Sequence, residues 1–382
     1  MLSSRCKQRN EDLIPSLLSQ HDAVLTGDMT TIDLSTAENW PVKVKVLDTL
    51  QDEHGQLSES DFAYSSGIGG CSKTRALLAD LLNTHFRPTR TVESSHIILA
   101  AGGSFALTAL IEQICNPGDG VLIASPYWAG LDISISIHSH AIITPVHVPL
   151  KEFFSVSSIS YYESAIGQSS VPIRAVLICN PHNPLGQCYP QETLRAMLDF
   201  FLELGDSQMS DQIHVVYSLS KDFGCNGMRL GALISQSAKA IRLSAALSLH
   251  SQVSSLSTAL ASRLISSVEK VQQITEYGGT ELKVAYMIMR SFLEARRMEF
   301  VPVAYGMFVF ARLLQLQSTA EDQELLKHLK SAGISVSTGS SYHFTQPGWF
   351  RICYGVPHEQ LQEGLRRLDA GVQNYLKEVT HL

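Results

Sequence analysis

The sequence of 382 residues predicts an α/β protein: a mainly parallel sheet with helices on both faces, followed by a smaller α+β domain. From about residue 95 to residue 233, short β-branched runs alternate with helix-like stretches, as in parallel sheets. The runs show almost no polar alternation, which suits strands buried on both faces; Ala175-Val-Leu-Ile-Cys179 is one example. Near residue 297, helical periodicity gives way to mixed strands and helices, which indicates a second domain.

The expected elements follow from these patterns in chain order. Strands are predicted at 96–100, 121–125, 141–148, 174–179, 214–218 and 231–234. Helical periodicity continues to about residue 297, and the small domain then has strands at 307–310 and 349–354 and helices at 321–332 and 358–378. We therefore expect a large domain at 61–295 and a small C-terminal domain at 296–382. Residues 1–60 are expected to be irregular and to pack on the small domain.

Composition excludes several classes of protein. Asp and Glu outnumber Lys and Arg by 36 to 29, and this net charge of −7 argues against a nucleic-acid partner. No apolar run reaches the ~18 residues of a membrane span, and the first 20 residues lack the apolar core of a signal peptide. The seven cysteines include no C-x-x-C pair, which favours reduced thiols. The sequence predicts a cytoplasmic protein with neither a nucleic-acid nor a membrane partner.

The segment Tyr217-Ser-Leu-Ser-Lys-Asp-Phe-Gly224 carries the first candidate site. A predicted strand leads directly into Lys221, and a lysine at the end of a buried strand is costly unless it has a function. Desolvation lowers the pKa of such an amine and makes it nucleophilic, as a Schiff-base lysine requires. The hydroxyls of Ser218 and Ser220 and the guanidinium of Arg229 could hold a phosphate beside it. The alternative is an ordinary lysine in a surface loop.

Three other turns follow predicted strands, at the sheet edge where ligands bind in open α/β proteins. Residues 100–107 form a glycine-rich turn that opens a helix, a typical place for a phosphate. Residues 180–186 contain two Asn-Pro steps that restrict the backbone, and residues 125–130 offer an aromatic face for a planar ring. A purely structural turn and a core aromatic are the alternatives for these segments.

Arg351 lies within the apolar segment Trp349-Phe-Arg-Ile-Cys-Tyr354, so it is expected to be half-buried and to need an anionic partner. A substrate carboxylate would serve, and an internal Asp or Glu is the alternative. His138 and His140 flank Ser139 but have no third ligand at a fixed spacing, so no metal site is predicted.

In this order and spacing, these segments resemble the fold-type-I pyridoxal-phosphate enzymes of the class I and II aminotransferase family. Within it, the chain is most similar to fungal relatives of aminocyclopropane-carboxylate synthase. The resemblance covers nearly the whole chain and is carried most specifically by Ile32-Asp-Leu-Ser-Thr-Ala-Glu-Asn-Trp40, Pro117-Gly-Asp-Gly120, Ser218-Leu-Ser-Lys-Asp-Phe-Gly224 and Gly348-Trp-Phe-Arg-Ile-Cys353.

The resemblance implies pyridoxal 5′-phosphate as cofactor, an α-amino acid as substrate and roles for individual residues. Lys221 would be the Schiff-base lysine that also moves the α-proton, and Arg351 would take the substrate α-carboxylate. Trp128 would stack on the pyridine ring, and Asn183 would bond the phenolic oxygen. Tyr64 would reach the phosphate of a partner subunit, so a homodimer is expected. The groups implied around the phosphate are Ser218, Ser220, Arg229 and the backbone at Ser104 and Phe105.

One part of the family pattern is missing. Family members carry a strand with Asp-x-x-Tyr before the lysine strand, and its Asp keeps the pyridinium nitrogen protonated so that the ring is an electron sink. Here one predicted helix and a short polar segment, 205–212, lead directly from the Asn183 turn to the lysine strand. Asp206 and Asp211 lie in that segment, which lacks a strand pattern, so neither is assigned this role. Loss of the strand would leave its neighbours unpaired or bring them together by about 4.8 Å.

The leading functional prediction is a pyridoxal-phosphate enzyme acting on an α-amino acid, aminotransferase-like or aminocyclopropane-carboxylate-synthase-like, in fungal secondary metabolism. A carbon–sulfur β-lyase is one alternative, because the motifs specify the cofactor and the α-carboxylate but not the reaction that follows. The other is a catalytically impaired homologue, or the product of a truncated gene, acting as a dimeric partner protein. The missing Asp-x-x-Tyr favours that alternative, whereas Lys221, Arg229 and Arg351 favour an enzyme.

Overall fold

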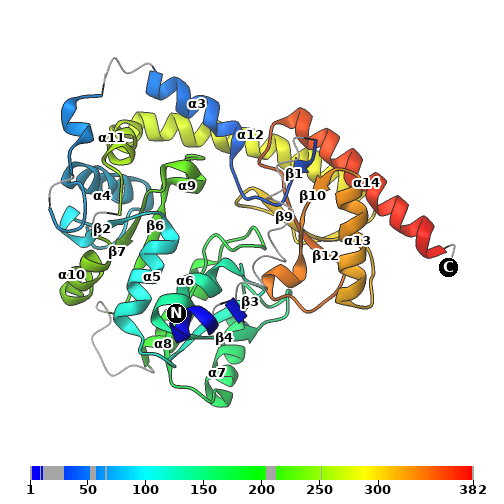
Figure 1. Cartoon of the computed structure of the whole chain (residues 1–382), viewed down its shortest axis with the longest axis horizontal. Coiled ribbons are helices and arrows are strands. Elements are labelled where there is room, and N and C mark those ends of the chain that lie inside the picture. Colours follow the sequence, from blue (N-terminus) through cyan, green and yellow to red (C-terminus); the bar gives the residue numbers. More distant parts are fainter. Residues whose placement is uncertain are drawn as a thin grey trace.

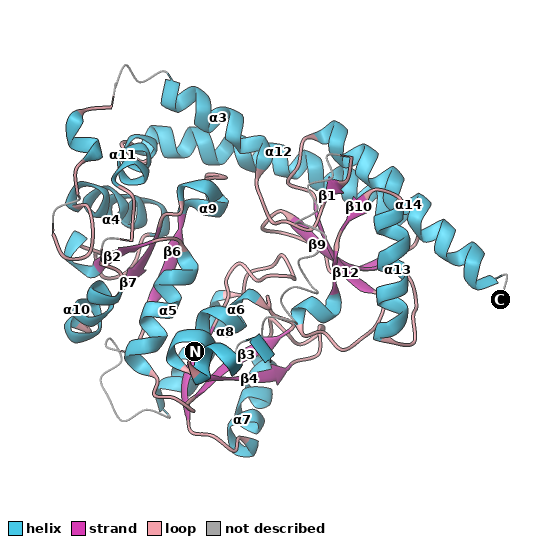
Figure 2. Cartoon of the chain, in the orientation of Figure 1, coloured by secondary structure: helices cyan, strands magenta, loops and turns pink. Residues whose placement is uncertain are grey.

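The computed structural model describes residues 2–8, 10–11, 30–51, 57–64, 67–203, 212–250 and 252–380. It confirms the predicted α/β class, with helices on both faces of the sheets and a smaller α+β part (Figures 1 and 2). Within those ranges, no helix combines the length and apolarity that crossing a bilayer requires.

All six strands predicted for the large sheet are present, but they form two sheets of three strands each. In one sheet, β7 (Gly231–Ile234) lies between β2 (Ile97–Ala100) and β6 (Val215–Ser218) and is antiparallel to both. In the other, β3 (Gly120–Ser125) lies between β4 (Ile142–His147) and β5 (Ile173–Leu177), and all three are parallel. Among the described strands none pairs with both β5 and β6, so the expected loss of a strand leaves its neighbours unpaired.

Helices cover both sheets, and α5 (Gly103–Ile114) packs on each of them. Leu110 packs with residues of β2 and β7, whereas Leu107 and Ile111 pack with β3. In Figure 1, α5 lies between the two sheets. The other helices of this part are α4 (Ser72–Phe86), α6 (Gly130–Ser139), α7 (Ile159–Gln168), α8 (Gln191–Glu203), α9 (Leu219–Asp222), α10 (Lys239–Ser248) and α11 (Ser255–Leu264).

The C-terminal part is a four-stranded antiparallel sheet packed against long helices. Its strand order is β11 (Ser337–Thr338), β12 (Trp349–Cys353), β9 (Phe308–Arg312) and β8 (Glu299–Phe300). The helices are α12 (Val268–Ala295), α13 (Thr319–Ser331) and α14 (His358–Thr380). In α14, buried side chains recur at helical spacing and form one apolar face, which explains why this helix was evident in the sequence. They are Leu361, Leu365, Leu368, Val372 and Tyr375.

The N-terminal residues are more regular than expected. After α1 (Ser4–Gln8), the short strand β1 (Ile32–Asp33) pairs in parallel with β10 (Ile334–Ser335). The prediction of an irregular start is wrong for α3 (Trp40–Gln51), which lies along α12 (Figure 1). Its Val-Lys-Val-Lys-Val run has strand-like alternation, yet Val42 and Val46 are four residues apart and enter one core together. The packed helical face overrides the alternating pattern.

Candidate active site

Lys221 stands on the short helix α9, directly after strand β6. Ser218 caps this helix, and its hydroxyl accepts a hydrogen bond from the backbone N–H of Ser220. The Lys221 amine donates to the carbonyl oxygen of Ala37 at 2.6 Å. Burial lowers the pKa of this amine, and the nearby charge of Arg351 lowers it further. The Lys221 side chain remains partly exposed, and the lowered pKa shifts its amine toward the neutral, nucleophilic form.

Arg351 projects from β12 and is only 4% exposed. Its guanidinium donates to the side-chain oxygen of Asn183 at 3.0 Å and to the carbonyl oxygen of Ser35. The rings of Phe308 and Tyr342 lie 5.0 and 4.9 Å from its central carbon, and its Nε atom has no hydrogen-bond partner. No carboxylate of the described residues lies within ion-pair distance of it, so the internal Asp or Glu considered above is not observed. A buried cation with neutral partners suits the carboxylate of a ligand.

The side chains predicted to hold a phosphate meet at the N-terminus of α5. The hydroxyls of Ser218 and Ser220 are 2.8 Å apart, and a Cβ atom on Gly103 would lie 3.6 Å from the Cβ of Ser218. Arg229 reaches across Gly102, where a Cβ atom would come within 2.3 Å of its Nη2. Gly102 has φ +91°, which favours glycine, so the turn both tolerates this backbone and leaves room for the guanidinium. Ser104 and Phe105 follow in the first turn of α5.

Two predicted site residues do not contact the groups described so far. Trp128 follows β3 and is 42% exposed, and its ring lies against Gly130 at the start of α6. Tyr64 is 96% exposed. Asp206 and Asp211, from the short segment before β6, lie outside the described residues.

Several site groups had no signal in the sequence. The carbonyl oxygens of Ser35 and Ala37 bring the loop after β1 against Arg351 and Lys221. Backbone carbonyls carry no residue-type pattern, so only the fold could reveal them. Cys353 is also buried here; burial raises the pKa of its thiol, while the charges of Arg351 and Lys221 oppose that shift.

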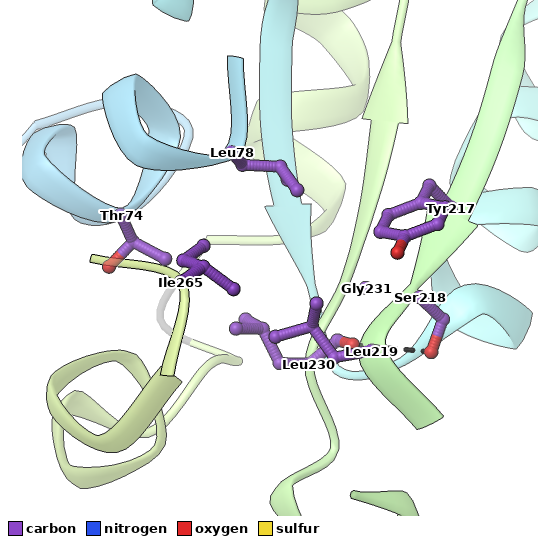
Figure 3. A pocket seen from close by; sticks show the side chains of 8 residues that line it. All are labelled: Thr74, Leu78, Tyr217, Ser218, Leu219, Leu230, Gly231 and Ile265. Atoms are coloured by element: carbon purple, nitrogen blue, oxygen red, sulfur yellow. Dashed lines mark hydrogen bonds between the residues drawn. The ribbon is translucent and has the colours of Figure 1, made fainter. Parts of the chain in front are cut away.

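A small cavity lies behind the phosphate-binding side chains, and Figure 3 shows the eight residues that line it. Its volume of about 10 Å³ is close to that of a single water, and its lining includes Leu78, Leu230 and Ile265. It is too small for a cofactor.

These groups fit pyridoxal phosphate on structural grounds. Ser218, Ser220, Arg229 and the N-terminus of a 12-residue helix form an anion cradle that a Cβ atom at Gly102 would fill. Lys221 supplies a desolvated amine, and Arg351 has an unpartnered buried Nε atom. The fold is shared with a solved aminotransferase structure. The chain superimposes on Thermus thermophilus aspartate aminotransferase double mutant 1 with a TM-score of 0.79, at 19% identity, over 97% of this chain and 99% of the other.

The chain belongs to the class I and II aminotransferase family, whose model it matches over residues 31–214 and 203–368. It is 45% identical to a Claviceps purpurea protein named "Probable aminotransferase tcpI", over 98% of this chain and 97% of the relative. It is 27% identical to 1-aminocyclopropane-1-carboxylate synthase 5 of Arabidopsis thaliana, over 88% and 80% respectively. The predicted family is confirmed, and with it pyridoxal 5′-phosphate as the cofactor of this class of enzyme.

The comparisons also reveal an internal difference. The two matched stretches overlap at residues 203–214, between α8 and β6, so the family pattern is interrupted there. The alignment with the Claviceps relative spans 411 positions, against 382 residues in this chain, so at least 29 positions have no counterpart here.

Proposed function

We propose that this enzyme transfers the amino group of an α-amino acid, with Lys221, Arg351 and the Ser218–Ser220–Arg229 cradle as its site. The observation that carries the proposal is that the lysine amine and the arginine guanidinium, 130 positions apart in sequence, contact carbonyls two residues apart in one loop, those of Ala37 and Ser35. The cradle lies beside the lysine on the same short helix and on the facing turn.

Each residue has a role in this proposal. When bound, the cofactor supplies an electron sink for charge that develops at the substrate α-carbon. The lowered pKa of Lys221 raises the share of neutral amine, which can take the α-proton and return it. Arg351 holds the α-carboxylate and thereby orients the α-carbon toward the lysine. The remaining cofactor contacts proposed are Asn183, Trp128, the phosphate cradle with Ser104 and Phe105, and Tyr64 of a second subunit.

The test is to supply the pyridoxal-phosphate-loaded protein with a panel of L-amino acids and one 2-oxo acid. Formation of a new amino acid from the 2-oxo acid supports transfer. Lys221→Ala is the control and should show no transfer. Turnover by that variant at the wild-type rate would contradict the proposal.

A carbon–sulfur β-lyase is the second candidate, and the similarity to an aminocyclopropane-carboxylate synthase favours it because that name denotes chemistry other than amino transfer. The same panel distinguishes the two, since β-elimination releases ammonia and a 2-oxo acid without consuming a second 2-oxo acid. A catalytically impaired partner protein is the third, favoured by the divided sheet. We propose a cytoplasmic enzyme of fungal secondary metabolism; the Claviceps relative supports the fungal and aminotransferase parts of this proposal.

We further propose that the enzyme is a homodimer. Large apolar side chains are strongly exposed on α3 and the segment after it: Val44 (58%), Leu47 (56%), Phe62 (70%) and Tyr64 (96%). Strongly exposed apolar side chains of this kind favour association with a second copy. Light scattering should give twice the chain mass of 41.9 kDa, and Leu47→Glu with Phe62→Glu should reduce it to one chain. A monomeric wild type would contradict this part of the proposal.

A further inference from the structure

The two three-stranded sheets each end in an unpaired strand, and the two strands follow each other along the chain. β5 pairs only with β3, and β6 pairs only with β7, among the strands of the described ranges. Each therefore has one edge whose backbone N–H and C=O groups lack strand partners. Proteins normally pair, cover or charge such edges, because an open edge invites association.

The side chains of both strands are not typical of a sheet edge that faces solvent. β2, β3 and β7 are buried at every position, whereas every residue of β5 and β6 is at least partly exposed, and Val215 is 50% exposed. Yet apart from Arg174, whose Nε donates to the carbonyl oxygen of Ile114, the residues of Ile173–Leu177 and Val215–Ser218 are mostly apolar, as in interior strands. Both strands therefore have the mostly apolar residues of interior strands, although each lies at the edge of its sheet.

Both edges border the same helix. The apolar cluster of Leu107 and Ile111 on α5 includes β3, and Ala175 and Leu177 of β5 pack against it from one side. Val216 of β6 packs against the same cluster. One helix therefore contacts strands of both sheets, and β5 and β6 each pack against it.

We propose that the functional polypeptide contains a further internal segment between Glu203 and Gln212, which forms a strand between β5 and β6 and joins the two sheets into one. The family match is interrupted at residues 203–214, and the Claviceps alignment requires at least 29 additional positions. A strand with its connections needs about 20–30 residues, which agrees with that number. The helix α8 follows β5 and already supplies the crossover to a parallel strand beside it.

The position of this segment has a consequence for the site. The carboxyl end of a strand parallel to β5 would emerge between the Asn183 turn, which follows β5, and Lys221, which follows β6. A side chain from that end would face the bound ligand. The inference does not depend on the proposed reaction, because the pairing of the sheet edges can be measured without cofactor or substrate.

Hydrogen exchange tests the proposal directly. In the 382-residue chain, amides of β5 and β6 should exchange at least about 100-fold faster than those of β3 and β7, which pair with a strand on both sides, because open edges are protected only by local structure. The matching segment of the Claviceps relative is then inserted in place of residues 204–211. Protection of β5 and β6 should rise by about 100-fold, with β3 and β7 as unchanged internal references. An insert with the same residues in scrambled order is the control and should give no protection.

Three results would overturn the proposal. Edges that are already as protected as the central strands β3 and β7 in the 382-residue chain would show that no strand is missing. Protection that rises with protein concentration would identify a strand from a second copy as the occupant. Finally, the protein isolated from its natural source should exceed 41.9 kDa by at least roughly 3 kDa, given the mean residue mass of this chain and 29 further residues, and an intact mass of 41.9 kDa would exclude the segment.

Discussion

Replacing Arg351 with methionine should greatly weaken binding of a carboxylate while leaving the stability of the fold almost unchanged. The guanidinium makes two hydrogen bonds to neutral oxygens, those of Asn183 and Ser35. At about 1.5 kcal/mol for each charge-assisted bond, their loss costs about 3 kcal/mol. Against this, an unpaired cation that is 4% exposed carries a desolvation cost of several kcal/mol, which methionine removes. The two effects offset each other, and the free energy of unfolding should change by less than about 2 kcal/mol.

For binding of a carboxylate ligand, no such gain offsets the loss of the guanidinium. Truncating one partner of a buried, hydrogen-bonded charge pair costs about 2–5 kcal/mol, which corresponds to a 30- to 4,000-fold loss of affinity. The ligand for this assay is 2-aminoisobutyrate, which has the α-amino and α-carboxylate groups but no α-proton. Its binding to the pyridoxal-phosphate-loaded protein is followed by visible absorption, and stability is followed by urea unfolding.

Arg312→Met is the matched control. Arg312 lies on the neighbouring strand β9, and its nearest acidic partner is Glu299 at 3.9 Å, so its loss should leave 2-aminoisobutyrate affinity unchanged. The reasoning would be refuted if Arg351→Met lowered the free energy of unfolding by more than about 4 kcal/mol while binding was retained. Arg351 would then be a structural residue.

Three further predictions concern single positions. Because burial holds the Lys221 pKa below its unfolded value of 10.5, the charged amine favours the unfolded state at neutral pH. Lys221→Met should therefore be more stable than wild type in urea unfolding at pH 7. The difference in stability should shrink as the pH rises toward 10.5, and a difference that grows would contradict this reasoning. Gly102→Ala and Gly118→Ala place a side chain at φ +91° and +89°, and each should lower the free energy of unfolding by about 1–2 kcal/mol. Only the side chain at position 102 would meet Arg229, so only Gly102→Ala should weaken pyridoxal-phosphate binding, by roughly 10-fold or more. Equal affinities of the two variants would refute the role of Gly102. Burial depresses the pKa of His182 from 6.5 to about 3, so the free energy of unfolding of wild type should fall as the pH drops between these values, by up to about 1.4 kcal/mol per pH unit. The His182→Gln variant should lack this dependence on pH. Parallel pH profiles of the two proteins would contradict the assignment to His182.

The elements that sequence reasoning located are those with a strong periodic signal. The six apolar runs of the large part are β2 to β7, each with ends within two residues of those expected. The short strands β1, β8, β10 and β11 have only two residues each, so no period of two can be recognised in them. In α3, alternating Val and Lys concealed a helix that forms because Val42 and Val46 pack together against α12 and the first sheet.

The candidate site was predictable where it depends on side chains in motifs. Lys221, Ser218, Ser220 and Arg229 stand in one short stretch, and the structure places them around one helix start. The link between Arg351 and Asn183 joins residues 168 positions apart, and no spacing rule predicts it. The loop carbonyls that contact Lys221 and Arg351 were also invisible, because any residue type can supply a carbonyl.

The most direct test of the central claim, that Lys221 is the cofactor-binding lysine of this site, is a visible absorption spectrum with added pyridoxal phosphate. The purified chain should develop a band that amino acids shift, and borohydride should then fix the cofactor to the peptide containing Lys221. The Lys221→Ala variant should show neither. The same band in the variant, or a label on another lysine, would contradict the account.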